Sequence, residues 1–201
     1  MYTQLRLSAL EKGKKVALKE LGVEPITMMA DITQPLILSE KYDIALLWGL
    51  AIPHFSPWKW VRVLVNILNI LVDDGLFMYD EGDRVYNTFI IRGFREIILQ
   101  VVEENRVVLD IFADRNSRTG DIKKLYVDFI TRERATINLY YWDMASSAAF
   151  TWIFFEDVGF MPIRSSCVGA VLAYRPRRVI KPGDFIVKNP TIVQLDKGSV
   201  A

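Results

Sequence analysis

The stretch from Tyr42 to Glu81 begins YDIALLWGLAIPHFS, continues as PWKWVRVLVNILNIL and ends VDDGLFMYDE. Its opening apolar run is typical of a parallel strand that is buried on both faces. Pro57 suits the first turn of a helix, and the apolar residues after it recur at helical spacing. An Asp-Gly turn then leads into a second strand, residues 76–79, which ends at Asp80 and Glu81. Strand, loop, helix and strand in this order predict an α/β fold with a parallel sheet, whose ligands bind at the carboxyl ends of the strands.

The segment before this stretch continues the alternation of helix and strand. Ser8 and Glu11 have the S-x-x-E spacing of a capping box, which predicts a helix that runs to Leu21. A short strand at residues 5–7 is expected before this helix. Residues 26–32 (ITMMADI) predict another strand with an acid near its end.

The second half of the chain has a different pattern. The expected elements are helix 86–104, strands 106–113, 122–131 and 135–142, helix 145–158 ended by Gly159, and strands 160–166 and 170–174. The first three strands alternate apolar and polar residues, which predicts an antiparallel ribbon with one solvated face. We expect a single domain over residues 1–178, an inserted β ribbon at about 105–143 and a C-terminal extension at 179–201.

Composition limits the classes of function. The formal net charge of +1 argues against a broad nucleic-acid surface. The single cysteine, Cys167, rules out an internal disulfide and a cysteine zinc cluster, and no other metal-ligand spacing is present. The N-terminal residues contain no apolar run of signal-peptide length, and the apolar helix after Pro57 is too short and too polar to span a bilayer. These features predict a cytoplasmic protein with no metal, no nucleic acid and no membrane partner.

Five segments resemble, in order, the class I S-adenosylmethionine-dependent methyltransferases of the small-molecule type. LSALEKGKKVALKELGV resembles the second strand and following helix of that family, ITMMADI its third strand and KYDIALLWGLAIPHFS its fourth strand and loop. LVDDGLFMYDE resembles the Leu-x-x-Gly-Gly turn and fifth strand, and FFEDVGFMPIRSS resembles the last helix and the entry into a closing hairpin. Together they cover residues 5–175. The resemblance implies a Rossmann-like methyltransferase sheet, mostly parallel with a closing antiparallel hairpin.

The resemblance also implies S-adenosylmethionine as the cofactor. Asp31, followed by Ile32, stands where the family's acid bonds the adenine amino group. Gly49 and Leu50 follow the fourth strand, on the rim that faces the cofactor. The family's first strand and its G-x-G-x-G loop have no counterpart, so the sheet is expected to be N-terminally incomplete. Arg6 stands where the family has an acid that bonds the ribose hydroxyls, and an arginine cannot accept those hydrogen bonds.

The missing strand is central in the family's sheet, so its absence predicts an exposed strand edge. Exposed edges pair with other strands, and we expect a second copy or a partner chain to cover this one. Two functions of different classes follow. One is an S-adenosylmethionine-dependent methyltransferase-like protein that acts on a small molecule, in a truncated or degenerate form. The alternative is a non-catalytic partner or scaffold protein that has this fold and no longer binds the cofactor.

Five residues are candidates for contact with the substrate. His54 is the only histidine and titrates near neutrality, which makes it the candidate general base, although a lone loop histidine is more often structural. Asp80 and Glu81 can orient an amine or a hydroxyl, but neighbours on a strand point to opposite faces and do not form a paired dyad. Tyr141 and Trp142 can hold a planar or cationic substrate, with core packing as the alternative.

Overall fold

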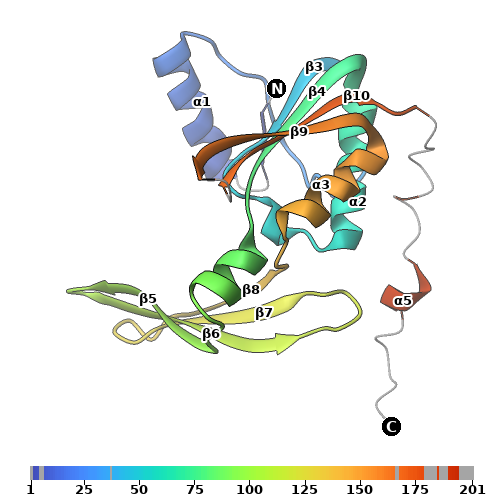
Figure 1. Ribbon diagram of the computed structural model, residues 1–201. Helices are drawn as coiled ribbons and strands as arrows, with labels where there is room; N and C mark the ends of the chain where they lie inside the picture. The colour runs from blue at the N-terminus through green and yellow to red at the C-terminus, as the bar shows by residue number, and fades with distance from the viewer. Residues whose placement is uncertain are drawn as a thin grey trace.

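The computed structural model describes residues 2–4, 7–36, 38–165, 168–178, 185 and 190–194. Within these residues the strands form three separate sheets. Arg6, Cys167 and most of the expected extension at 179–201 lie outside the described residues. Figure 1 shows the two larger sheets as separate layers, with the helices between and beside them.

The strand order confirms the predicted α/β class. β1 (Tyr2–Gln4) and β2 (Thr27–Met29) form a parallel pair. The main sheet has the order β3 (Tyr42–Leu47), β4 (Leu71–Gly82), β10 (Val168–Pro176) and β9 (Phe155–Ser165). β3 runs parallel to β4, whereas β10 is antiparallel to both β4 and β9. Parallel pairs together with a closing antiparallel hairpin are the arrangement that the sequence motifs predict.

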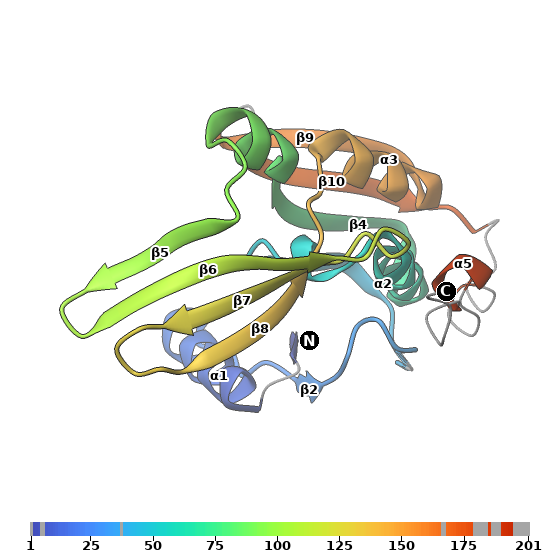
Figure 2. The ribbon, with the colours of Figure 1, turned by 90° about the horizontal axis from the view of Figure 1, so that it is seen from below.

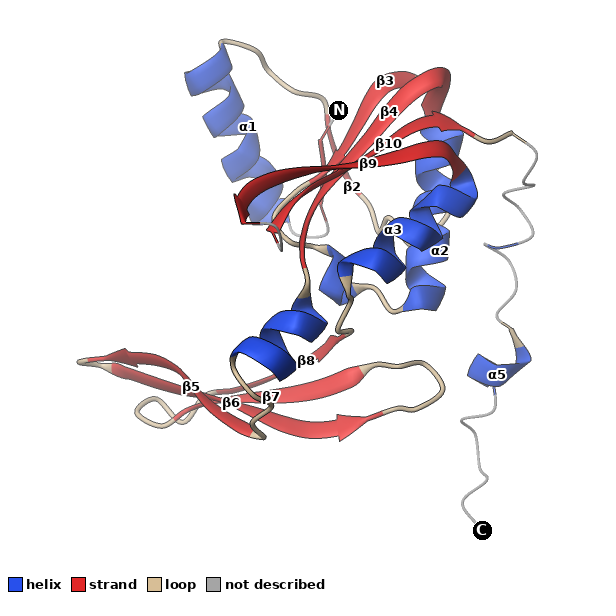
Figure 3. Cartoon of the chain, viewed as in Figure 1, coloured by secondary structure: helices blue, strands red, loops and turns tan. Residues whose placement is uncertain are grey.

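The helices divide between these sheets (Figure 3). α1 (Leu7–Leu21) packs beside β1 and β2. α2 (Pro57–Ile70) and α3 (Met144–Phe154) pack on the main sheet and on each other. The short elements are η1 (Ile52–His54), the π-helical turn η2 (Tyr86–Ile91) and α5 (Thr191–Gln194). No helix in the described part of the chain is long and apolar enough to cross a membrane.

α2 forms the centre of the core, and contacts at both of its ends explain its length. Pro57 occupies its first turn, where a missing amide hydrogen does no harm. Arg178 donates hydrogen bonds to the carbonyl oxygens of Leu68 and Leu71, at 2.7 Å and 2.8 Å. These carbonyls have no partner inside the helix, so the guanidinium satisfies them and complements the negative end of the helix dipole.

The core lies between α2, α3 and one face of the main sheet. Every second residue of β4 points into it, and the rings of Phe77 and Tyr79 lie 6.1 Å and 5.2 Å from that of Trp60. All three side chains are fully buried, and each contributes about 2–3 kcal/mol of hydrophobic stabilisation. Tyr79 keeps its hydroxyl satisfied through Thr151 of α3, at 3.1 Å.

The opposite face of the main sheet is apolar and has no described element packed on it. We call it the open face; by register it carries Ile44, Leu46, Leu76, Met78 and Leu172. Ile44 and Leu46 are 60% and 57% exposed. In the described part of the chain β3 pairs on one side only, with β4, and it shares no sheet with β1. The expected open edge is therefore present at β3.

A second, fully antiparallel sheet lies beyond the carboxyl end of β4 and is called the cap sheet (Figure 2). Its order is β5 (Ile97–Glu103), β6 (Arg106–Arg115), β7 (Ile122–Asp128) and β8 (Arg134–Leu139). η2 and residues 140–143 connect it to the main sheet. It corresponds to the predicted inserted ribbon, with β5 as an additional strand.

The expected helix at residues 86–104 is wrong. Helical turns end at Ile91, and Gly93 adopts a left-handed φ of +66°, the usual conformation just after a helix. From Ile97 the chain pairs with β6, with Leu99 opposite Leu109. Short apolar runs fit both the helical and the strand periodicity. Here the pairing of residues 97–103 with β6 selects the strand.

Three other boundaries differ from the expectation. α1 begins at Leu7, so Ser8 lies inside the helix and does not cap it. β4 begins at Leu71, before the Asp-Gly turn that was expected to precede it. α3 ends at Phe154, and β9 begins immediately because Phe155 pairs with Pro176 of β10. For β4 and β9 the register of the main sheet overrides the local signal.

Candidate functional site

The loop after β3 is held in a strained conformation at the carboxyl end of the sheet. Gly49 and Leu50 both have left-handed φ angles, of +101° and +53°. This region costs a side-chain-bearing residue about 1–2 kcal/mol, so surrounding contacts must stabilise it. The Leu50 amide donates to Oδ1 of Asp80 at 2.9 Å. Two residues predicted for different roles, one for the cofactor and one for the substrate, are thus directly bonded.

The space beside Gly49 is open. A Cβ built on this residue would meet no atom within 4 Å. The backbone is therefore accessible where a ligand approaches the carboxyl ends of the strands.

Glu81 is the most unusual group at this end of the sheet. Its side chain is fully buried, and Oε1 accepts the Gly82 amide at 2.9 Å. Arg84 places Nε 3.6 Å from the same oxygen, too far for a hydrogen bond. Among the described residues, Oε2 of Glu81 and Nε of Arg84 are buried without a hydrogen-bond partner. Burial raises the pKa of Glu81 to about 7, although the Gly82 amide and Arg84 oppose the shift. An acceptor and a donor that both lack a hydrogen bond therefore lie in the same ion pair.

His54 lies at the end of η1, with an exposed side chain. Partial burial lowers its pKa, and the positive charge of Arg84 lowers it further. The imidazole is therefore neutral at pH 7 and can accept a proton. The structure places His54 within the electrostatic influence of Arg84, which its position in the sequence could not indicate.

Hydrogen bonds connect this loop to the segment after β8. Tyr140 donates its amide to the Pro53 carbonyl at 2.7 Å, and Trp142 donates its indole N–H to the Phe55 carbonyl at 2.9 Å. The Arg84 amide in turn donates to the Trp142 carbonyl at 3.0 Å. The segments after β3, β4 and β8 therefore form one bonded unit around the carboxyl ends.

Trp142 and Tyr141 lie in different environments. Trp142 is fully buried and packs against Tyr140 and Phe150, with ring centroids 4.8 Å and 5.5 Å away. In this structure it acts in packing. Tyr141 is partly exposed, and its ring lies 5.8 Å from the Lys124 ammonium and 6.1 Å from Phe89.

A buried ion pair lies on the same side of the cap sheet as Tyr141. Lys124 Nζ and Asp110 Oδ2 are 2.6 Å apart, and the two side chains are 11% and 6% exposed. Tyr126 approaches the same oxygen at 3.5 Å, while Oδ1 of Asp110 is buried without a partner among the described residues. Burial lowers the pKa of Lys124, but the interactions with Asp110 and Tyr141 outweigh it and raise the pKa. Sequence reasoning missed this pair; the available signal is a charge at an inward position of an apolar strand.

Asp31 and Ile32 follow β2, which belongs to the separate two-stranded sheet. Oδ1 of Asp31 accepts from the amide and the hydroxyl of Thr33, at 2.8 Å and 2.7 Å. Ile32 packs against the main core, and its carbonyl accepts from the buried Asn66 of α2 at 2.6 Å. Asn66 also binds the Gln34 carbonyl and thereby fixes the loop after Asp31.

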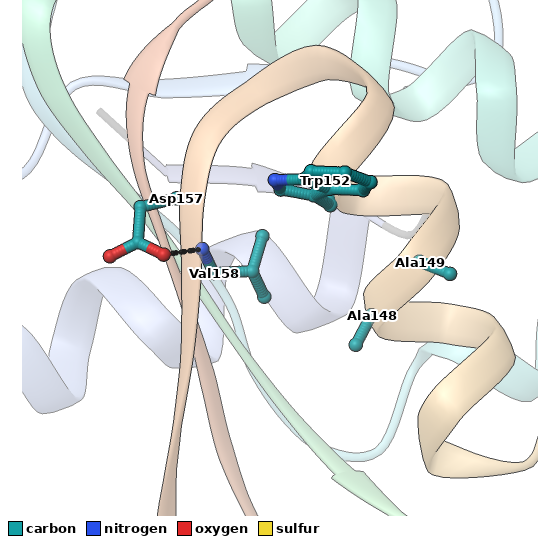
Figure 4. Close-up of a pocket in the computed structure, with 5 residues that line it drawn as sticks. All are labelled: Ala148, Ala149, Trp152, Asp157 and Val158. Carbon is teal, nitrogen blue, oxygen red and sulfur yellow. Dashed lines mark hydrogen bonds between the residues drawn. The ribbon is translucent and has the colours of Figure 1, made fainter.

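A surface pocket lies far from these groups. It occupies about 330 Å³ and is lined by Ala148, Ala149, Trp152, Asp157 and Val158 (Figure 4). Asp157 and Leu76 both lie opposite Tyr174, so the pocket is level with the middle of β4 and not with its carboxyl end. Ligands of α/β sheets bind at the carboxyl ends of the strands, and the pocket is lined by a single charged side chain. We therefore place the candidate site at the carboxyl ends of β3 and β4.

No protein-family model matches the chain, and no curated protein matches it. Solved structures do match. The chain is similar to an S-adenosylmethionine-dependent methyltransferase from Clostridium acetobutylicum, with a TM-score of 0.64 and 10% identity over 88% of this chain and 75% of that one. It is similar to the CcbJ methyltransferase from Streptomyces caelestis, with a TM-score of 0.64 and 10% identity over 87% and 74%. A third is an amino pentose methyltransferase from Micromonospora echinaspora with S-adenosylmethionine bound, with a TM-score of 0.53 and 13% identity over 86% and 72%.

These likenesses define the fold of the chain. It has the fold of the class I S-adenosylmethionine-dependent methyltransferases of small molecules, as its sequence motifs predict. At such identities the shared property is the architecture, and the chemistry must be argued from the residues of the site.

Proposed function

We propose that this chain is an S-adenosylmethionine-dependent methyltransferase that acts on a small molecule. The observation that carries the proposal is a pair of buried atoms at the carboxyl end of β4, Glu81 Oε2 and Arg84 Nε, that have no hydrogen-bond partner among the described residues, although Arg84 forms a long ion pair with Glu81 Oε1. Leaving a buried polar atom unpaired costs about 1–3 kcal/mol, and a ligand that pairs both groups would remove this cost.

The described residues fit the adenosine part of the cofactor. Asp31 is exposed and uses one oxygen for its local turn, so its carboxylate can still accept from an amino group. Ile32 offers an apolar contact beside it. The open space at Gly49 and the left-handed Leu50 let a flat ring approach the backbone. When bound, the cofactor supplies an electrophilic methyl group on a sulfonium centre.

The chain's own residues would orient the methyl acceptor. Glu81 has a pKa near 7, so it can accept a proton from an amine or a hydroxyl at neutral pH. Arg84 lies beside it and stabilises the carboxylate that remains before the transfer. His54, neutral and close to Arg84, is a second proton acceptor. Tyr141 and the Asp110–Lys124 pair form the side of the site that the cap sheet contributes. One solved neighbour acts on an amino pentose, and an aminosugar is therefore a suitable first acceptor to test.

Two measurements test this proposal. Isothermal titration of the purified chain with S-adenosylmethionine should give binding that Asp31→Ala weakens, while Asp43→Ala, an exposed acid of β3, leaves it unchanged. No heat and no thermal shift at millimolar cofactor would contradict the proposal. With an active acceptor, Glu81→Gln should lower the methylation rate about 100-fold at pH 7 without loss of cofactor binding.

The second candidate is a non-catalytic partner or scaffold with this fold. The observation that favours it is the unpaired edge of β3 beside the apolar open face. A strand edge with exposed Ile44 and Leu46 is a template for another chain. This function predicts a complex that protects the β3 amides from hydrogen exchange, together with no cofactor binding. Full exchange of these amides in the complex would contradict it.

A further inference from the structure

Two connections join the cap sheet to the main sheet within the described part of the chain. The first connection runs from the end of β4 through η2 and comprises residues 82–96. The second is the segment 140–143, between β8 and α3. Both are visible in Figure 1 as the crossings between the two larger sheets. The position of the cap sheet relative to Glu81 therefore depends on these two segments.

The carboxylate of Asp83 bonds to both connections. Its Oδ1 accepts from the amide of Tyr86 at the start of η2, at 2.7 Å. Its Oδ2 accepts from the amide of Met144, the first residue of α3, in a longer bond of 3.4 Å. A backbone bond lies beside it, from the Arg84 amide to the Trp142 carbonyl at 3.0 Å. Amides at the start of a helix have no partner inside the helix, so one side chain satisfies two of them and links the two helices.

Each of the two linked helices is fixed to a different sheet. The ring of Phe89 in η2 stacks on that of Phe94 at 5.6 Å, and Phe94 lies edge-on to Phe112 of β6 at 5.5 Å. η2 therefore packs with the cap sheet. α3 belongs to the main core, where Thr151 bonds to the hydroxyl of Tyr79 in β4 at 3.1 Å. A link between the starts of η2 and α3 consequently fixes the cap sheet relative to the main sheet.

The groups of the candidate site lie on both sides of this link. Glu81 belongs to β4 and precedes Asp83 by two residues, and Arg84 follows it, with Nε 3.6 Å from Oε1 of Glu81. Tyr141 belongs to the second connection. A shift of one connection against the other would move Tyr141 relative to Glu81. A displacement of about 1 Å at a reacting centre can cost about 100-fold in rate.

We propose that Asp83 is a positioning residue for the proposed methyl transfer. Its carboxylate ties the start of η2 to the start of α3, and this link holds Arg84 and Tyr141 at fixed positions around Glu81. Asp83 acts through these groups rather than on the substrate. The role rests on the proposed function, whereas the link itself is a property of the fold and can be tested without a substrate.

The bond to α3 can be removed without a change to Asp83. Met144 is the first residue of α3, a position that tolerates proline because an amide there has no partner inside the helix. Asp143 before it has an extended backbone, which suits a residue that precedes proline. Met144→Pro should therefore keep α3 and lose the bond to Asp83. Met144→Ala, which keeps the amide, is the matched control.

Asp83→Ser breaks the same link from the other side. Serine accepts from the amide three residues on as aspartate does, so the bond to Tyr86 is kept, but the oxygen that faces Met144 is lost. Both Met144→Pro and Asp83→Ser should lower kcat for methyl transfer about 10-fold or more, with unchanged affinity for S-adenosylmethionine. Asp143→Ser should keep the wild-type kcat, because both oxygens of Asp143 bond to Ser146 inside α3. Wild-type kcat in both link variants overturns the proposal, and so does an equal loss in Asp143→Ser.

A distance measurement tests the link without turnover. Spin labels are attached to Asp43→Cys on β3 and Lys123→Cys on β7, both exposed, in a chain whose single cysteine, Cys167, is replaced by serine. The distance distribution between the labels, from double electron–electron resonance, should broaden with Met144→Pro and stay unchanged with Met144→Ala. An unchanged distribution with Met144→Pro overturns the proposal, whether or not the chain methylates an acceptor. Broadening in a chain that binds no S-adenosylmethionine supports the link and contradicts the methyl transfer for which it is proposed.

Discussion

Asp80 accepts a hydrogen bond from the backbone amide of Leu50 at 2.9 Å, and so joins the carboxyl ends of β3 and β4. The bond fixes a residue whose φ is +53°. A strained turn is retained here because a neighbouring strand supplies the acceptor, and strain of this kind is concentrated at functional sites.

Removal of that acceptor should release the turn. Asp80→Ala is expected to lower the free energy of unfolding by about 1–2 kcal/mol, because the Leu50 amide loses its partner and the left-handed conformation loses its support. Asp80→Asn retains an acceptor oxygen and should lose less. Urea unfolding measures both, with Asp43→Ala as the exposed control; equal losses for all three would contradict this reading.

The buried carboxyl group of Glu81 should make stability depend on pH. An unfolded glutamate releases its proton near pH 4.5, whereas the folded one holds it to about pH 7. Between these values the folded state binds more protons, so the stability contributed by this group is complete below about pH 4.5 and falls as pH rises through 7. The free energy of unfolding that Glu81 contributes is therefore about 3 kcal/mol larger at pH 4.5 than above pH 7. Glu81→Gln should therefore flatten the profile and exceed the wild type at pH 8.

The control for that experiment is Glu40→Gln, which changes the same type of side chain at an exposed position. Its profile should parallel that of the wild type. The contrary result is a stability profile of Glu81→Gln that runs parallel to that of the wild type over roughly pH 4 to 8, which spans ordinary and raised carboxyl pKa values. That result would show that the Glu81 carboxyl group titrates normally and would contradict its burial.

Asn66 should control the loop that follows β2. Its amide donates to the carbonyls of Ile32 and Gln34 at 2.6 Å and 2.7 Å, and its oxygen accepts from the Leu36 amide at 3.2 Å. Asn66→Ala should cost about 2–3 kcal/mol, because three partly buried hydrogen bonds to backbone groups are lost. Protease cleavage at residues 32–36 should accelerate in this variant. Asn69→Ala, on the same helix, is the matched control and should cleave at the wild-type rate.

The ion pair of Asp110 and Lys124 should behave as a coupled unit. Lys124→Met leaves a buried carboxylate unpaired and should destabilise the chain by about 3–5 kcal/mol. Asp110→Asn combined with Lys124→Met removes both charges and should recover most of that loss. A double-mutant cycle followed by thermal unfolding measures the coupling, and additive losses would show that the two side chains act independently.

The unit from β3 to β4 could be predicted from sequence because its signals are local. Pro57 begins α2 where expected. The apolar run predicts the strand β3 correctly, but its burial on both faces is wrong, because β3 is an edge strand with Ile44 and Leu46 60% and 57% exposed. η2 and β5 could not be separated in the same way, since their apolar residues fit a helical and a strand period equally well. Pairing with β6 decides, and a single sequence does not contain that information.

Only part of the candidate site could be predicted from sequence, again because some of its residues depend on contacts between distant parts of the chain. Asp80 and Glu81 could be placed at a strand end by pattern alone. Arg84, Asp110 and Lys124 gain their importance from burial and from partners distant in the sequence, and no short motif records either property. Trp142 shows the converse case, since an aromatic residue beside the site is used in packing.

The position of β4 has a consequence for how the chain folds. Each strand of the cap sheet neighbours the strand next to it in sequence, so residues 97–139 need only local contacts to pair. β4, in contrast, must pair with β10, and Gly82 meets Val168 across that gap. Contacts between distant residues form slowly. The cap sheet is therefore expected to be complete early, and the pairing of β4 with β10, followed by docking of Arg178 on the end of α2, to be the last step.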